Sequence, residues 1–167
     1  MKRWYVISAQ SRGEEKAAHH LQRQGYETYL PRFLKRRSHA RKIDWVPAPM
    51  FPRYLFVSLD LDCDQWVSIR STVGVSQIIC LGDTPTPVPE GVIEEIMARE
   101  DENGLVKLSM GSRFKKGDKV QVIGGAFGEH VGLFDCSDDN QRVFILLNLL
   151  GREVKVRLPV EAVSAVA

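Results

Sequence analysis

The chain has 167 residues, of which 44% are hydrophobic and 26% are charged, a balance typical of a folded globular protein. Its length suits one domain of ordinary size or two small ones, and no apolar run approaches the roughly eighteen residues that cross a bilayer. The N-terminus lacks the apolar core of a secretory signal, so we expect a cytoplasmic protein without membrane association.

The net charge of +2 conceals an asymmetry along the chain. Residues 1–53 hold 12 Lys and Arg against 4 Asp and Glu, whereas residues 54–112 hold 3 against 10. A basic first third suggests a polyanion nearby, and nucleic acid is the usual candidate. The alternative, a solvated basic face with no ligand, is about equally favoured by charge alone.

The first predicted elements are a strand at 3–9 and a helix within 11–25. Ser11 and Glu14 have the spacing of a capping box, and Gly25 is a plausible C-terminal stop. Four side chains recur at spacings of three and four and therefore share one face of this helix: Arg12, Lys16, His20 and Arg23.

A second strand is expected at 26–34, followed by the basic run KRRSHARK at 35–42. This run is interpreted either as the tip of a hairpin projecting from the sheet or as a mobile, solvated loop. Strand-like pieces follow on either side of a bend marked by prolines 47, 49 and 52.

Further elements are predicted as a short helix at 62–72, a strand at 75–82, a proline-rich connector and a helix at 92–101. The last helix carries an apolar stripe that is normally core: Val92, Ile93, Ile96 and Met97. Residues 101–112 are polar and lack clear periodicity, so we interpret them as a linker.

From Arg113 the pattern changes to short apolar runs separated by turn residues: KVQVI, VGLFDC, RVFILLNLL, EVKVRLP and a tail ending AVSAVA. Such spacing indicates a small β-barrel. The expected organisation is a domain at 1–100, a linker at 101–112 and a barrel at 113–167.

No pattern for catalysis, cofactor binding or metal binding is present. The cysteines at 63, 80 and 136 form no C-x-x-C pair, and the four histidines form no metal-binding cluster. There is no phosphate-binding P-loop and no G-x-S-x-G elbow. We therefore expect a protein that is not an enzyme.

The chain resembles the NusG family of bacterial transcription elongation factors. The similarity is carried first by WYVIS, YLPRF, FPRYLFV at 51–57 and RSTVGVSQII at 70–79. It is carried second by F-x-x-G-D-x-V-x-V, from Phe114 to Val122, with G-x-F at 125–127 and Gly132, which is similar to a KOW motif.

The resemblance implies an α+β N-terminal domain, an antiparallel sheet flanked by helices, followed by a small five-stranded KOW β-barrel. In the family, the first domain binds the clamp of RNA polymerase through an apolar depression, bridges the DNA channel and suppresses pausing. The KOW domain recruits partners such as a ribosomal protein or the termination factor Rho. A monomer is expected.

Carried onto this chain, the polymerase-binding candidates are the aromatic bend and part of the last helix: Phe51, Pro52, Tyr54, Phe56, Ile93 and Met97. Large aromatic side chains at a proline-fixed bend lose few rotamers on docking. Core packing is the alternative for Phe56, Ile93 and Met97.

The basic residues then have a candidate ligand, upstream or non-template DNA. The predicted contacts are the helix face named above and four residues of the basic run: Lys35, Arg36, Arg37 and Arg41. Trp66 and Arg70 are further candidates for touching polymerase or an unpaired base, with packing the alternative for Trp66. Phe144 and Leu150 are the candidates for KOW partner binding.

RVFILLNLL is richer in leucine than the general family pattern and resembles the specialised paralogue RfaH, an antiterminator. In that relative the C-terminal domain switches between a helical hairpin and a barrel. Leucine favours such a helical form, whereas Gly151 and the Val-rich 154–163 favour strands. A ribosome- or RNA-binding KOW protein is the alternative for the whole chain, and a hydrolase with an unrecognised site is a remote third.

Overall fold

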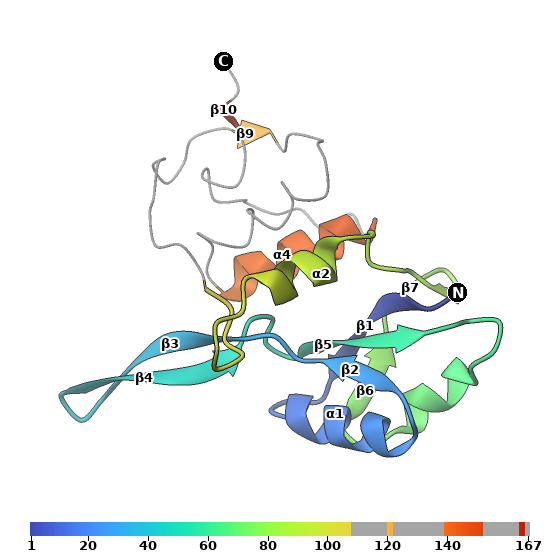
Figure 1. Ribbon diagram of the computed structural model, residues 1–167, viewed down its shortest axis with the longest axis horizontal. Coiled ribbons are helices and arrows are strands. Elements are labelled where there is room, and N and C mark those ends of the chain that lie inside the picture. Colours follow the sequence, from blue (N-terminus) through green and yellow to red (C-terminus); the bar gives the residue numbers. More distant parts are fainter. Residues whose placement is uncertain (108–119, 122–138, 152–163, 166–167) are drawn as a thin grey trace. The chain divides into compact units, whose positions relative to one another are not determined.

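The computed structural model describes residues 1–107, 120–121, 139–151 and 164–165 (Figure 1). The chain forms two compact units. The first combines Met1–Pro31 with Pro49–Val88, and the second combines Arg32–Ala48 with Pro89–Ala167. The predicted boundaries at residues 100 and 113 remain a prediction.

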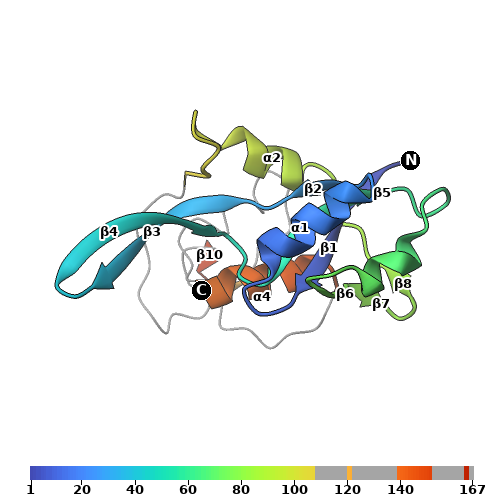
Figure 2. The same ribbon diagram turned by 90° about the horizontal axis from the view of Figure 1, so that it is seen from below.

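The first unit is built on a four-stranded antiparallel sheet with strand order β2-β5-β1-β6 (Figure 2). Its strands are β1 (Arg3–Ala9), β2 (Glu27–Tyr29), β5 (Tyr54–Leu59) and β6 (Val75–Ile78). The strand predicted at 3–9 and the strand-like piece after Pro52 form the central pair, and the α+β architecture expected for the N-terminal part is confirmed.

Helix α1 (Glu14–Arg23) covers one face of this sheet. Ala17 and Leu21 of the helix are fully buried there, among side chains from alternate positions of the central strands: Tyr5, Ile7, Ala9, Leu55, Val57 and Leu59. Burying one such leucine contributes about 1.5–3 kcal/mol. Its buried apolar residues therefore form the core-facing side of the helix.

The capping box predicted at Ser11 and Glu14 is wrong. Gly13 is the N-cap residue and no side chain caps the helix. The Glu14 carboxylate instead accepts a hydrogen bond from the backbone N–H of Arg53, at 2.8 Å. Gly25 does follow the helix in a left-handed conformation, with φ of 95°, as predicted for its C-terminal stop.

The predicted strand at 26–34 is divided by Leu30 and Pro31, after which β3 (Arg32–His39) belongs to the second unit. It pairs with β4 (Lys42–Pro49) in a separate two-stranded sheet. The basic run is therefore a β-hairpin rather than a loop, and its turn is Ala40-Arg41, with φ of 50° and 67°.

The helix predicted at 62–72 is only the short 3₁₀ helix η1 (Trp66–Ser71). Asp60, Asp62 and Asp64 lie in the turn before it, where the Asp64 carboxylate accepts from the Asp60 N–H. The strand predicted at 75–82 is interrupted at Ile79, and β7 (Cys80–Leu81) then pairs with β8 (Thr84–Pro85).

In the second unit, α2 (Val92–Ala98) confirms the predicted helix in a shorter form, with Val92, Ile93 and Ile96 buried. The beginning of the predicted linker is hydrogen-bonded: the Val106 N–H donates to the Arg32 carbonyl and the Lys107 N–H to the Arg99 carbonyl. Residues 101–107 are therefore attached to β3 and to the end of α2.

The strand predicted for RVFILLNLL is wrong, because helix α4 spans Asp139–Leu149. High-propensity leucines, an acidic residue in the first turn and Gly151 just beyond the end all favour a helix here. Strands β9 (Val120–Gln121) and β10 (Ser164–Ala165) pair antiparallel, as strands were predicted in both places. The predicted strands VGLFDC and EVKVRLP lie outside the described residues.

Candidate functional site

The aromatic bend before β5 is held in one conformation by backbone hydrogen bonds. Met50 N–H donates to the Pro31 carbonyl at 2.8 Å, and Tyr54 N–H donates to the Phe51 carbonyl at 2.9 Å. Between them Arg53 adopts a left-handed conformation, with φ of 72°, which is uncommon for a residue other than glycine.

Both backbone groups of Arg53 have partners. Its N–H donates to the Glu14 carboxylate, and its carbonyl accepts from the Ala9 N–H at 2.7 Å. The start of α1 and the end of β1 thus stabilise a backbone conformation that is otherwise disfavoured. The bend is a preorganised surface feature rather than a free loop.

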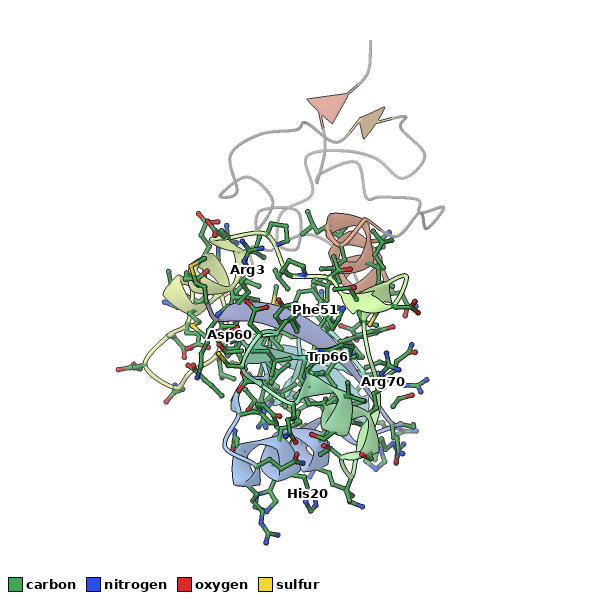
Figure 3. All side chains as sticks on the ribbon, turned by 90° about the vertical axis from the view of Figure 1, so that its right-hand side faces the viewer. Arg3, His20, Phe51, Asp60, Trp66 and Arg70 are labelled. Carbon is green, nitrogen blue, oxygen red and sulfur yellow. The ribbon has the colours of Figure 1, made fainter. Side chains whose placement is uncertain are left out.

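A row of aromatic rings lies beside this bend, on the sheet face opposite α1. Phe56 meets Phe51 edge-on with ring centroids 5.7 Å apart, and it stacks on Tyr29 at 6.3 Å. Trp4 meets Tyr29 edge-on at 6.4 Å. Figure 3 shows Phe51 and the α1 residue His20 on opposite sides of the sheet.

The predicted polymerase-binding residues differ in exposure. Phe51, Phe56 and Ile93 are buried. Pro52, Tyr54 and Met97 are partly exposed. Ile93 and Met97 lie on α2, which belongs to the second unit, whereas the bend belongs to the first.

Three of the four basic residues predicted on the first helix are exposed: Arg12, Lys16 and Arg23. No ion pair of the described residues involves them, so their charges are free to meet a polyanion. His20 is half-buried, and its ring meets that of His19 edge-on at 5.4 Å.

The four predicted cations of the hairpin are also exposed, and two are neutralised. Lys35 forms an ion pair with Asp139 of α4, and Arg37 forms one with Asp44 at 2.7 Å. Arg36 and Arg41 form no ion pair with any described residue. The structure describes this basic surface and that of α1 in separate units.

Trp66 is partly buried against the core that α1 covers, and the Arg70 guanidinium carbon lies 5.7 Å from the centroid of its ring. Figure 3 shows the two residues as neighbours. The packing alternative for Trp66 is therefore confirmed, while Arg70 remains exposed.

The C-terminal candidates lie on or beside α4. Leu150 is buried, together with Ile145, Leu146 and Leu147, and the side chain of Phe144 lies outside the described residues. Their predicted role in binding a KOW partner stays a prediction.

Sequence reasoning missed the residues that attach α4 to the hairpin. Arg142 is only 3% exposed, forms an ion pair with Asp139, and places its guanidinium carbon 4.5 Å from the centroid of the Phe33 ring. The spacing of Asp139 and Arg142 is a helical one, so it would have been informative only if the segment had been interpreted as a helix.

The described residues contain no group of three His, Cys, Asp or Glu residues placed to hold a metal ion. None of their helices is long and apolar enough to span a membrane.

Comparison with known families decides the identity. The family model described as "Transcription termination factor nusG" matches residues 2–97, more than half of the chain. The chain belongs to the NusG family. It is therefore a transcription termination or antitermination factor, and its partners lie in the transcription complex. This membership is consistent with the expectation that it is not an enzyme.

The similarity to curated relatives extends beyond the family model. The Transcription termination/antitermination protein NusG of Bacillus subtilis is 27% identical over 94% of this chain and 94% of its own length. That of Thermus thermophilus is 25% identical over 93% of this chain and 94% of its own. A solved structure of Thermotoga maritima NusG, titled for its domain interaction, covers 75% of this chain and 74% of its own, at 22% identity and a TM-score of 0.43.

Proposed function

We propose that this NusG-family protein binds the clamp of bacterial RNA polymerase, bridges the DNA channel and suppresses pausing. The polymerase contact is the aromatic bend, with Pro52 and Tyr54 as its accessible side chains. The observation that carries this proposal is the double hydrogen bonding of Arg53, because a bend fixed before binding loses little entropy when it docks.

Phe51 and Phe56 enter the contact only after a rearrangement, because neither ring has exposed surface. In the bound state they would form the floor on which a partner side chain packs. Ile93 and Met97 of α2 are proposed to line the same depression.

The basic surfaces are proposed to contact DNA beside the polymerase. Arg12, Lys16 and Arg23 on α1 and Arg36 and Arg41 on the hairpin are exposed cations without carboxylate partners among the described residues. Such residues bind phosphates with an affinity that falls with salt and depends little on sequence. His20 lies at the edge of the α1 surface, and Lys35 and Arg37 would join after releasing Asp139 and Asp44.

The C-terminal part is proposed to recruit a ribosomal protein or Rho in a KOW-barrel state, through Phe144 and Leu150. The resemblance to RfaH, together with the helical α4, supports a second state in which residues 139–149 are helical. Leu150 is buried in the state described here, so recruitment through it requires the change of state.

A transcription assay tests the proposed function. Adding the protein to polymerase paused during elongation should shorten the pause, and polymerase lacking the coiled-coil tip of its clamp should not respond. An equal response from the truncated polymerase would show that the clamp is not the contact.

A further inference from the structure

The β3–β4 hairpin has two chemically different faces. The Arg37–Asp44 ion pair places these two residues on one face, and side chains alternate between the faces along each strand. Phe33 and Lys35, which contact α4 residues Arg142 and Asp139, share the face of Arg37. The other face is formed by the residues between them along each strand, which include Leu34 on β3 and Ile43 and Trp45 on β4.

That second face is apolar and open to solvent. Leu34 is 46% exposed, Ile43 is 56% exposed and Trp45 is 53% exposed, and by alternation all three lie on the side away from Arg37. Arg36 lies on the same face of β3. About half of the Trp45 surface is open to solvent beside two exposed aliphatic side chains, and exposed apolar surface of this kind is available for contact with a partner.

The charge of the hairpin indicates what covers this face. Strands β3 and β4 with their turn contain six Lys or Arg residues and one acidic residue, Asp44. Three of the cations are exposed and form no ion pair with a described residue: Arg36, Arg41 and Lys42. An apolar platform edged by unpaired cations complements a polyanion that also presents flat apolar rings.

Single-stranded DNA has that combination, whereas a duplex hides the faces of its bases within the stack. Aromatic side chains bind unpaired bases by stacking with little regard to sequence, and neighbouring cations follow the phosphates. An apolar protein surface would gain nothing from the surrounding positive charge.

We propose that the Trp45 face of the hairpin, formed by Leu34, Arg36, Ile43 and Trp45, is a stacking platform for unpaired bases of a DNA strand. Arg41 and Lys42 contact its phosphates. The inference rests on the proposed function in one respect, because an elongating polymerase is what supplies an unpaired strand beside this protein.

The test compares single-stranded and duplex DNA of equal length and composition, using the full chain and fluorescence anisotropy over a range of salt. Trp45→Ala should weaken single-strand binding by about 5- to 150-fold, the equivalent of roughly 1–3 kcal/mol for one stacked base. Duplex affinity and the salt dependence should stay unchanged, because no phosphate contact is removed. Trp45→Phe should restore most of the affinity.

Leu81→Ala is the control, since Leu81 is an apolar residue on β7 with 62% of its surface exposed, against 53% for Trp45. It should leave both affinities unaltered. Equal losses on the two DNA forms for Trp45→Ala, or no loss on either, would overturn the proposal. Thermal unfolding of each variant establishes that the fold is intact, as expected for exposed positions.

Binding to polymerase separates this proposal from the proposed function. If Trp45→Ala binds single-stranded DNA as the wild type does, and the wild type binds the elongation complex, then only the assignment of the stacking platform is wrong. If the wild type fails to bind the elongation complex but discriminates single strands through Trp45, only the proposed function is wrong. Weaker binding of Trp45→Ala to polymerase free of nucleic acid would assign the face to a protein contact and overturn the proposal.

Discussion

Phe51 packs edge-on against Phe56, with ring centroids 5.7 Å apart and no exposed surface on either ring. Residues inferred to bind a partner are thus also core residues of this state. Substituting either residue changes stability and binding together. The polymerase contact is therefore better tested at a partly exposed residue such as Tyr54.

Phe56→Ala should lower the free energy of unfolding by about 3–5 kcal/mol, because it empties a fully buried site next to Phe51 and Tyr29. Tyr54→Ala should cost only about 1 kcal/mol, since that side chain is partly exposed. Urea unfolding of both variants measures the difference. Equal costs would mean that the two positions are not distinguished by burial.

Gly74→Ala should destabilise the first unit strongly. An added Cβ at Gly74 would lie 2.7 Å from the backbone nitrogen of Ala17 and 3.0 Å from its Cα, and φ is 88°. Strain and overpacking together predict a loss of roughly 2–4 kcal/mol.

Gly82→Ala is the control for backbone strain alone, because φ is 67° there but no atom lies within 4 Å of the added Cβ. Its cost should be about 1 kcal/mol. Comparable thermal unfolding temperatures for the two variants would refute the close approach of α1 to the loop before β6.

Asp60→Asn should speed the alkylation of Cys63. The negative charge of Asp60 raises the pKa of the exposed Cys63 thiol, and Asp60 itself stays ionised because a hydrogen bond from the amino group of Met1, at 2.8 Å, lowers its pKa. A raised thiol pKa means less thiolate at a given pH, so removing the carboxylate should move the rate profile to lower pH.

Peptide mass spectrometry of iodoacetamide-treated protein follows Cys63 separately from the other cysteines. Asp83→Asn serves as the control, because Asp83 is exposed and does not affect the Cys63 thiol. An unchanged profile in Asp60→Asn would exclude the proposed electrostatic cause.

Residues 139–149 should give the positive Cα secondary chemical shifts of a helix in NMR spectra of the full chain. Asp139→Asn should reduce them, because it removes the charged partner of the buried guanidinium of Arg142 and of Lys35. Asn140→Ala, an exposed change in the same turn, should not reduce them. Negative shifts in the wild type would identify a strand and contradict α4.

The elements that were predicted correctly depend on local pattern. The apolar runs WYVIS and YLFV form the two central strands, which are buried on both faces, and Ala17 and Leu21 of α1 are buried one helical turn apart. The Ser11 capping box failed because the Glu14 carboxylate instead accepts from Arg53, a residue 39 positions away that local spacing does not reveal.

The secondary structure of the segment RVFILLNLL could not be predicted from its sequence pattern. A continuous apolar run fits a buried strand or a buried helix equally well, and the regular spacing of turn residues after Arg113 favoured the strand. Asp139 and Arg142, with their contacts to Lys35 and Phe33, favour the helix in the structure. Phe51 and Leu150 are both buried by tertiary packing, so their lack of exposure could not be predicted from local pattern.

The central claim is that the Pro52–Tyr54 bend docks on RNA polymerase, and binding of the full chain to a stalled elongation complex tests it most directly. Tyr54→Ala should bind markedly more weakly than the wild type, and Leu81→Ala, which changes an exposed residue outside the bend, should bind as the wild type does. Wild-type affinity in a folded Tyr54→Ala protein would contradict the claim.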